Sequence, residues 1–197
     1  MSSFAGGQSW MIWVMMALDQ PSHQKLEDFF VENYPMKRKR IKKGMHLTIY
    51  HARRPLVGLS NDTQDISIRI DSRDLRFMVM VPGGENKRPD VDPESNPIGL
   101  RVTRQSAALG QILELRQQFL GYETPKVLGE RKASSARRNA FGARHFQPHI
   151  TVLWSGKELG DDLTPAGTKF RAAIDFLHFD RLIVDCKEPK PLVGAAI

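Results

Sequence analysis

The chain has 197 residues, of which 41% are hydrophobic and 26% are charged, ordinary values for a globular protein with a substantial core. The formal net charge of +7 favours an anionic partner, such as a phosphorylated ligand or a nucleic acid, without choosing between them. The single cysteine, Cys186, excludes an intramolecular disulfide and a cysteine-based zinc cluster. Residues 10–18 are apolar but too few to span a bilayer, and they lack the features of a signal peptide. We therefore expect a cytoplasmic protein that does not contact membranes.

The first half of the chain predicts a strand, a helix and a basic segment in that order. Residues 10–18 form an apolar run typical of a buried strand. Ser22 is a suitable N-cap for a helix that continues to Tyr34, because Pro35 follows there. Residues 37–43 then carry a run of lysine and arginine.

The middle of the chain predicts two strands and a connection. Residues 66–70 and 75–81 alternate between apolar and other side chains, as half-buried strands do, and the turn residues at 71–74 predict a hairpin between them. Residues 82–97 are mostly proline, glycine, asparagine and charged residues, so we expect an exposed connection between two halves.

The second half repeats the order of the first. Residues 98–102 predict a strand, and residues 106–120 predict an amphipathic helix for which Gly121 suits the C-terminal cap. A basic, polar segment follows at residues 123–144. A last strand is predicted at residues 179–184.

One small unit appears in both halves, directly after each basic segment. It reads His46-Leu47-Thr48-Ile49 in the first half and His149-Ile150-Thr151-Val152 in the second. Strict alternation of this kind predicts a half-buried strand. One face of the first strand would carry His46, Thr48 and Tyr50, and one face of the second would carry His149, Thr151 and Leu153.

The alternation also predicts where three neighbouring side chains point. His51 would lie on the strand face opposite His46, and Trp154 would face the core. Tyr50 would share the face of His46, where it could stack on a base or simply pack against the wall of a cleft. The matching order of the two halves indicates a single bilobal α+β domain over residues 1–197. We expect duplicated β-α-β units, with two mainly antiparallel sheets around a central cleft.

Two histidines on opposite sides of a phosphodiester can catalyse its hydrolysis without a metal. One imidazole activates water and the other protonates the departing oxygen. Thr48 and Thr151 would donate hydrogen bonds to the non-bridging oxygens, where charge builds up in the transition state. His51 and His145 lie near the motifs, but no carboxylate or cysteine stands beside them at ligand spacing, so we expect neither a metal nor a cofactor.

With these motifs, the chain resembles the two-histidine (2H) phosphoesterase superfamily, and within it the RNA 2′,3′-cyclic phosphodiesterases, also called 2′-5′ RNA ligases. The hallmark of that family is a pair of His-X-Thr-X motifs, matched here by His46/Thr48 and His149/Thr151. The runs Met16-Ala17-Leu18-Asp19-Gln20-Pro21 and Phe179-Asp180-Arg181-Leu182-Ile183-Val184 are similar to the family as well. The resemblance implies a bilobal fold, hydrolysis of cyclic phosphates without a metal, histidines as the acid–base pair and threonines as phosphate ligands.

Three alternatives stay open at this point. The same machinery could act on ADP-ribose cyclic phosphate or on 2′-5′ oligonucleotides, and a non-catalytic RNA-binding module could use the basic segments alone. The residues do not decide which histidine is the acid and which the base. We expect a monomer whose partner is RNA or a cyclic-phosphate nucleotide.

Overall fold

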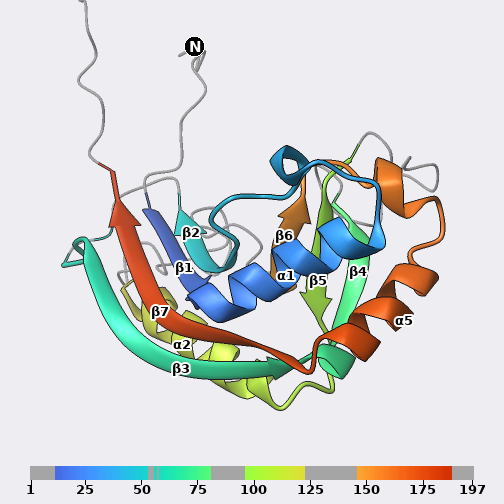
Figure 1. The fold of residues 1–197 in the computed structure, drawn as a ribbon. Helices are drawn as coiled ribbons and strands as arrows, with labels where there is room; N and C mark the ends of the chain where they lie inside the picture. Colours follow the sequence, from blue (N-terminus) through green and yellow to red (C-terminus); the bar gives the residue numbers. More distant parts are fainter. Residues whose placement is uncertain (1–11, 53–55, 57, 81–95, 123–145, 188–197) are drawn as a thin grey trace, which may run out of the picture.

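The fold is an α+β arrangement built on one antiparallel sheet (Figure 1). A computed structural model describes residues 12–52, 56, 58–80, 96–122 and 146–187. The strands within these ranges are β1 (Ile12–Leu18), β2 (His46–Ala52), β3 (Asp62–Asp71), β4 (Leu75–Val79), β5 (Ile98–Val102), β6 (His149–Leu153) and β7 (Phe176–Cys186). The helices are α1 (Gln20–Asn33), α2 (Ala108–Gly121) and α5 (Thr164–Ala173), with 3₁₀ turns η1 (Arg38–Arg40), η2 (Ser72–Asp74) and η5 (Lys157–Leu159).

The seven strands lie in the order β3-β7-β1-β2-β6-β5-β4, and every neighbouring pair is antiparallel. The described residues therefore form a single sheet, where two sheets were predicted. The two halves of the sheet meet between β2 and β6, which share one paired position, Leu47 with Ile150. Because this junction is so narrow, each half keeps its own ladder: β3, β7, β1 and β2 on one side and β6, β5 and β4 on the other.

The predicted hairpin at residues 71–74 is wrong. The strands on either side of it, β3 and β4, exist, but they form opposite edges of the sheet. β3 pairs with β7 and β4 pairs with β5. The connection is the 3₁₀ turn η2, whose ends bond elsewhere: Ser72 N–H donates to Asp175 O at 2.8 Å and Thr103 N–H donates to Asp74 O at 2.8 Å. Alternation identified the strands, but it carries no information about their partners.

Helix α1 begins at Gln20, and its N-cap lies three residues before Ser22, the predicted cap. Asp19 is the N-cap, and its Oδ1 accepts a hydrogen bond from Ser22 N–H at 2.7 Å. Proline in the first turn is compatible with this start, since its missing N–H has no partner there anyway. Gly121 likewise ends α2 as its last helical residue, and Tyr122 is the C-cap.

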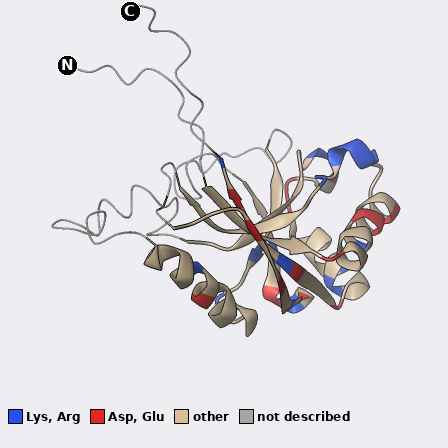
Figure 2. Ribbon diagram, turned by 90° about the vertical axis from the view of Figure 1, so that its left-hand side faces the viewer, with Lys and Arg blue, Asp and Glu red and all other residues tan. Residues whose placement is uncertain are grey.

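Helices cover both faces of the sheet (Figures 1 and 2). α1 and α5 pack over β4 through aromatic rings: Phe77 lies 6.1 Å from Phe30 and 5.6 Å from Phe170 between ring centroids. α2 packs on β2, where Phe119 lies 6.4 Å from Tyr50. Helix α5 had not been predicted, because its sequence, TPAGTKFRAA, carries only one large apolar side chain, Phe170.

Candidate active site

The two His/Thr strands are neighbours in the middle of the sheet. Leu47 on β2 is paired with Ile150 on β6, and the strands are antiparallel. Continued by one residue in each direction, this register sets His46 beside Thr151 and Thr48 beside His149. The two histidines are then diagonal neighbours, a relation that places Cβ atoms on the order of 7–8 Å apart in a regular ladder. Each histidine thus has the threonine of the other motif beside it.

Both imidazoles are held in the same way. His46 Nδ1 donates to Gly44 O at 2.9 Å, and His149 Nδ1 donates to Gln147 O at 2.8 Å. In each case the acceptor is the backbone carbonyl two residues earlier, and a carbonyl can only accept, so the proton lies on Nδ1. Nε2 is then the nitrogen that can take up or release a proton. Gly44 has a φ of +63°, a left-handed conformation that glycine adopts without strain.

His46 lies in an environment that opposes its protonation. Burial lowers its pKa below the ordinary value, and the positive charge of Lys42 and the neighbouring His149 lower it further, against the opposing effect of the Gly44 hydrogen bond. The coupling to His149 and Lys42 also shows that these three side chains lie near one another. At neutral pH, His46 is therefore neutral and can accept a proton at Nε2.

A β-bulge interrupts the alternation at the same position of both motif strands. On β2, Thr48 pairs with Met15 and Tyr50 with Val14, so Ile49 is the extra residue. On β6, Thr151 pairs with Gly99 and Leu153 with Ile98, so Val152 is the extra residue. A bulge of this kind shifts the following residues by one position with respect to the two faces.

The bulge on β2 overturns two predictions. Tyr50 does not share the face of His46: it is 0% exposed, and its ring packs against Phe119 at 6.4 Å. Tyr50 is therefore a core residue and not a substrate-binding one. His51 returns to the face of His46, where it pairs in register with Trp13 and its ring lies 5.0 Å from the Trp13 ring.

His51 lies in an environment that strongly opposes its protonation. Burial, Arg116 and His149 lower its pKa to about 4, so it is neutral at physiological pH. Arg116, on α2, is only 4% exposed and lies close by. Its Nη1 donates to the carbonyl of Ile49 at 2.6 Å, and this bond satisfies the oxygen of the bulged residue. Sequence reasoning missed this contact, because an arginine on an amphipathic helix is ordinarily solvent-exposed.

The bulge on β6 overturns the prediction for Trp154. Leu153 is fully buried, whereas Trp154 is 55% exposed and does not face the core. The ammonium of Lys42 lies 4.8 Å from the centroid of its ring. Lys42 was not singled out from the sequence, and the only signal for it was its position in the basic run before the first motif.

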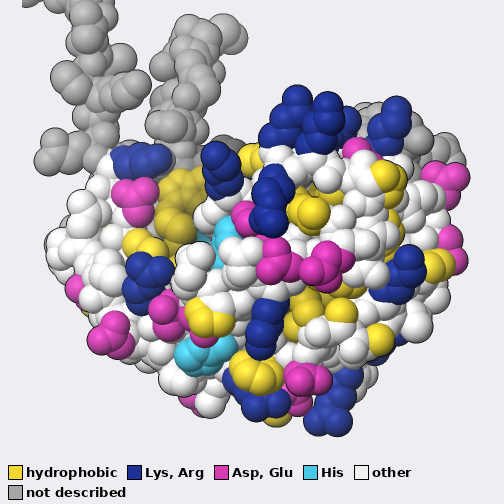
Figure 3. Space-filling view, viewed as in Figure 1, with side chains coloured by type: hydrophobic (Ala, Val, Ile, Leu, Met, Phe, Trp, Pro, Cys, Tyr) yellow, Lys and Arg dark blue, Asp and Glu magenta, His cyan; other side chains and the backbone are white. Residues whose placement is uncertain are grey.

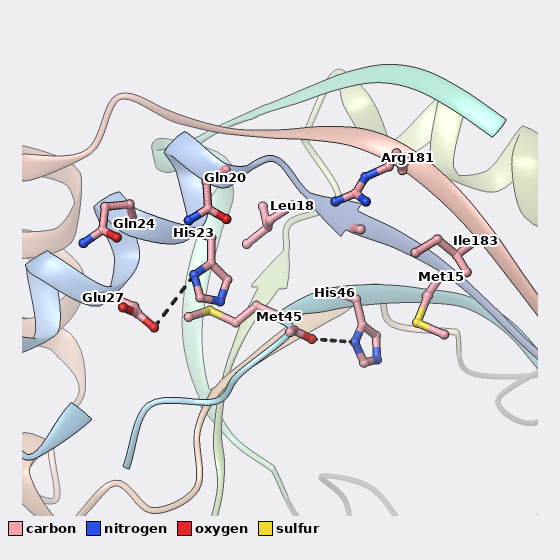
Figure 4. A pocket seen from close by; sticks show the side chains of 12 residues that line it. Met15, Leu18, Gln20, His23, Gln24, Glu27, Met45, His46, Arg181 and Ile183 are labelled. Carbon is pink, nitrogen blue, oxygen red and sulfur yellow. Dashed lines mark hydrogen bonds and ion pairs between the residues drawn. The ribbon is translucent and has the colours of Figure 1, made fainter. Parts of the chain in front are cut away.

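A groove of about 530 Å³ lies beside His46 (Figure 4). β1 and β7 contribute apolar and basic side chains such as Met15 and Arg181, and the first turns of α1 contribute polar ones such as His23. His23 is 3.8 Å from Glu27 across one helical turn. The groove extends from His46 toward α1.

Basic side chains gather over η1 on the same side of the molecule (Figure 3). Part of this charge is already compensated, since Arg38 contacts Glu27 at 2.9 Å and Arg40 lies 3.7 Å from Glu158. Lys37, Lys39 and Lys43 are exposed. The described part of the basic segment therefore offers mainly lysines to an anionic ligand. The second predicted basic segment, residues 123–144, lies outside the described residues.

A further histidine, His178, serves the junction between β1 and α1. Its Nδ1 lies 2.9 Å from Asp19 Oδ2, its Nε2 lies 3.0 Å from Ser67 Oγ, and its backbone N–H donates to Ser22 Oγ at 2.9 Å. Burial tends to raise the pKa of Asp19, but hydrogen bonds from Ser22 and His178 outweigh it and lower the pKa. This network fixes the start of α1 against β7.

Among the described residues, no three His, Cys, Asp or Glu side chains lie close enough together to hold a metal ion. Within the same residues, the structure contains no helix of the length and apolar character needed to cross a membrane. Comparison with family models and with curated protein sequences gives no match for this chain.

Proposed function

We propose that the protein is a cyclic phosphodiesterase that hydrolyses 2′,3′-cyclic phosphates at RNA ends or on related nucleotides. In this proposal it acts as a cytoplasmic monomer and needs no metal. The observation that carries the proposal is the matched pair of histidines on adjacent strands, each with Nδ1–H bonded to the carbonyl two residues earlier and each followed two residues later by a threonine. Two ring nitrogens that can exchange protons on either side of a phosphate are what an in-line displacement requires.

The lowered pKa of His46 supports its assignment as the general base. In the proposed reaction, His46 Nε2 takes a proton from water, and the resulting hydroxide attacks phosphorus opposite the departing ribose oxygen. Protonated His149 gives its Nε2 proton to that oxygen, and the P–O bond breaks. Thr48 and Thr151 donate hydrogen bonds to the two non-bridging oxygens and stabilise their growing charge. The products are a phosphomonoester and a free ribose hydroxyl.

The order of elements supports a duplicated architecture behind this site. β1, α1 and β2 are followed later by β5, α2 and β6, and within each set the two strands pair antiparallel. The bulge falls three residues after the histidine in both motif strands. We infer two related lobes, each contributing one histidine and one threonine to a shared cleft.

The test is hydrolysis of 2′,3′-cyclic AMP and of an RNA oligonucleotide ending in a cyclic phosphate, measured in the presence of a chelator. We expect His46→Ala and His149→Ala each to lower kcat by about 10²–10⁴-fold, since a positioned acid or base contributes that much. His23→Ala is the matched control, because His23 lines the adjoining groove and has no place in the reaction. Full turnover by both motif variants would refute the mechanism.

A second candidate is a non-catalytic RNA-binding module, favoured by the exposed lysines around η1. It predicts salt-sensitive RNA binding that survives loss of both histidines, and no hydrolysis by the wild-type protein. ADP-ribose cyclic phosphate and 2′-5′ oligonucleotides belong in the same substrate panel, because the His/Thr site alone does not distinguish them from RNA ends.

A further inference from the structure

Lys42 and Trp154 do not contact the phosphate in the reaction proposed above, yet they lie beside the site. Trp154 is 55% exposed, and the Lys42 ammonium lies 4.8 Å from its ring centroid. The lysine lies over the indole, and more than half of the surface of Trp154 is still exposed. The other large hydrophobic side chains exposed among the described residues, Leu113 and Tyr122, are both on or next to α2.

Backbone contacts fix both residues to the end of β6. Trp154 N–H donates to Arg40 O at 3.0 Å, and Lys42 N–H donates to Val152 O at 2.9 Å. Between these two bonds, Ile41 forms an isolated bridge with Leu153, and both of these side chains are buried. Lys42 and Trp154 each follow a residue whose side chain points into the core, so their own side chains point to the other side.

That other side is the face of the catalytic residues. The bulge at Val152 returns the strand to the His149 and Thr151 face at position 154. Lys42 is near enough to His46 for its charge to act on that ring. Trp154 is three residues beyond Thr151, within about 10 Å along a strand. A base joined through its ribose to a phosphate on Thr151 can reach the indole.

We propose that Lys42 and Trp154 form a nucleobase subsite, in which the base of the substrate stacks on the open face of Trp154 while Lys42 attracts the phosphate. The inference rests on the proposed function and narrows its substrate to cyclic phosphates that carry a base. An indole is a suitable platform because every base has a π-face, so stacking tolerates any base sequence. A purely structural pair would instead stabilise the contact between residues 40–42 and β6.

The first experiment compares substrates with and without a base. We expect Trp154→Ala to raise KM for 2′,3′-cyclic AMP about tenfold, with little change in kcat, because stacking holds ground state and transition state alike. KM for methyl riboside 2,3-cyclic phosphate, which has no base, stays unchanged. Trp154→Phe retains most of the affinity. Tyr122→Ala, which removes another exposed aromatic ring, leaves both KM values as in the wild type.

If Trp154→Ala changes KM equally for the two substrates, or changes it for neither, the proposed base subsite is wrong. Thermal unfolding of each variant separates these outcomes from a loss of structure. If Trp154→Ala lowers the melting temperature and affects both substrates alike, the pair is structural and the inference is wrong.

The second experiment does not depend on turnover. In a His149→Ala protein that also carries Trp10→Phe and Trp13→Phe, Trp154 is the only remaining tryptophan of three. We expect 2′,3′-cyclic AMP to quench its fluorescence to saturation, and the methyl riboside cyclic phosphate not to do so. No quenching by either compound, or equal quenching by both, contradicts a base subsite. If nucleotides quench but no cyclic phosphate is hydrolysed by the wild type, the proposed function fails while the subsite stands.

Discussion

The motif strands β2 and β6 are alike up to the bulge and different after it. Each carries histidine, apolar residue, threonine and a bulged apolar residue, and each buries the residue that follows. The next position is His51 on β2, packed against Trp13, and Trp154 on β6, exposed beneath Lys42. In the proposed reaction, the repeated part of each strand contributes one histidine and one threonine to the phosphate. The part beyond the bulge gives the two ends of the site different environments.

Substitution of the two threonines tests whether the repeated part of both strands takes part in the proposed reaction. In the proposed reaction each donates one hydrogen bond to a non-bridging oxygen, so Thr48→Val and Thr151→Val should each lower kcat by about 10²-fold. Valine keeps the β-branched shape and removes only the hydroxyl. Steady-state hydrolysis of 2′,3′-cyclic AMP measures both effects. A loss in one variant alone would show that the two motifs are not equivalent.

The His51 environment can be tested through the pH dependence of stability. Its pKa is about 4 in the folded protein and about 6.5 when exposed, so in this range the unfolded chain binds the proton first. The stabilisation is present above pH 6.5 and is lost as the pH falls toward 4. We expect the free energy of unfolding of His51→Asn to decline less over this range than that of the wild type. Urea unfolding at several pH values measures the difference, and parallel curves would contradict the burial of His51.

Lys42 connects the exposed end of β6 to the chemistry at His46. Its positive charge is one of the causes that lower the pKa of His46, so Lys42→Gln should raise that pKa. Because the base must be neutral, the acid limb of the kcat/KM profile should move to higher pH in this variant. Lys43→Gln, a change of an exposed neighbour, is the control. An acid limb that stays in place would mean that Lys42 does not act on the base.

The helices that precede the motif strands differ in a smaller way. Asp19 caps α1 with its side chain, whereas the N-cap of α2, Ala107, makes no such bond. We expect Asp19→Ala to lower the free energy of unfolding by about 1–2 kcal/mol. Glu32→Ala, at an exposed position of the same helix, should change it by less than about 0.5 kcal/mol. Urea unfolding measures both. If Asp19→Ala lowers the free energy of unfolding no more than the control variant does, the Asp19 cap does not stabilise the protein.

The sequence alone determined where the strands of the candidate site lie and which residue types they carry. Period-two alternation identified β2, β6, β4 and part of β3, and helical spacing identified α1 and α2, because these patterns arise from the local geometry of the chain. The repeated His-X-Thr unit identified the candidate catalytic residues for the same reason: residue types at fixed spacing are local information.

Only the tertiary structure decided which strands are neighbours and which faces the side chains occupy. It placed β2 beside β6 and moved β3 and β4 to opposite edges, since strand pairing depends on contacts between residues far apart in the chain. It also inserted the bulges that bury Tyr50 and expose Trp154. Alternation is a reliable guide to faces only while the ladder is regular. A single extra residue, held in place here by Arg116 bonding to the carbonyl of Ile49, reverses every assignment beyond it.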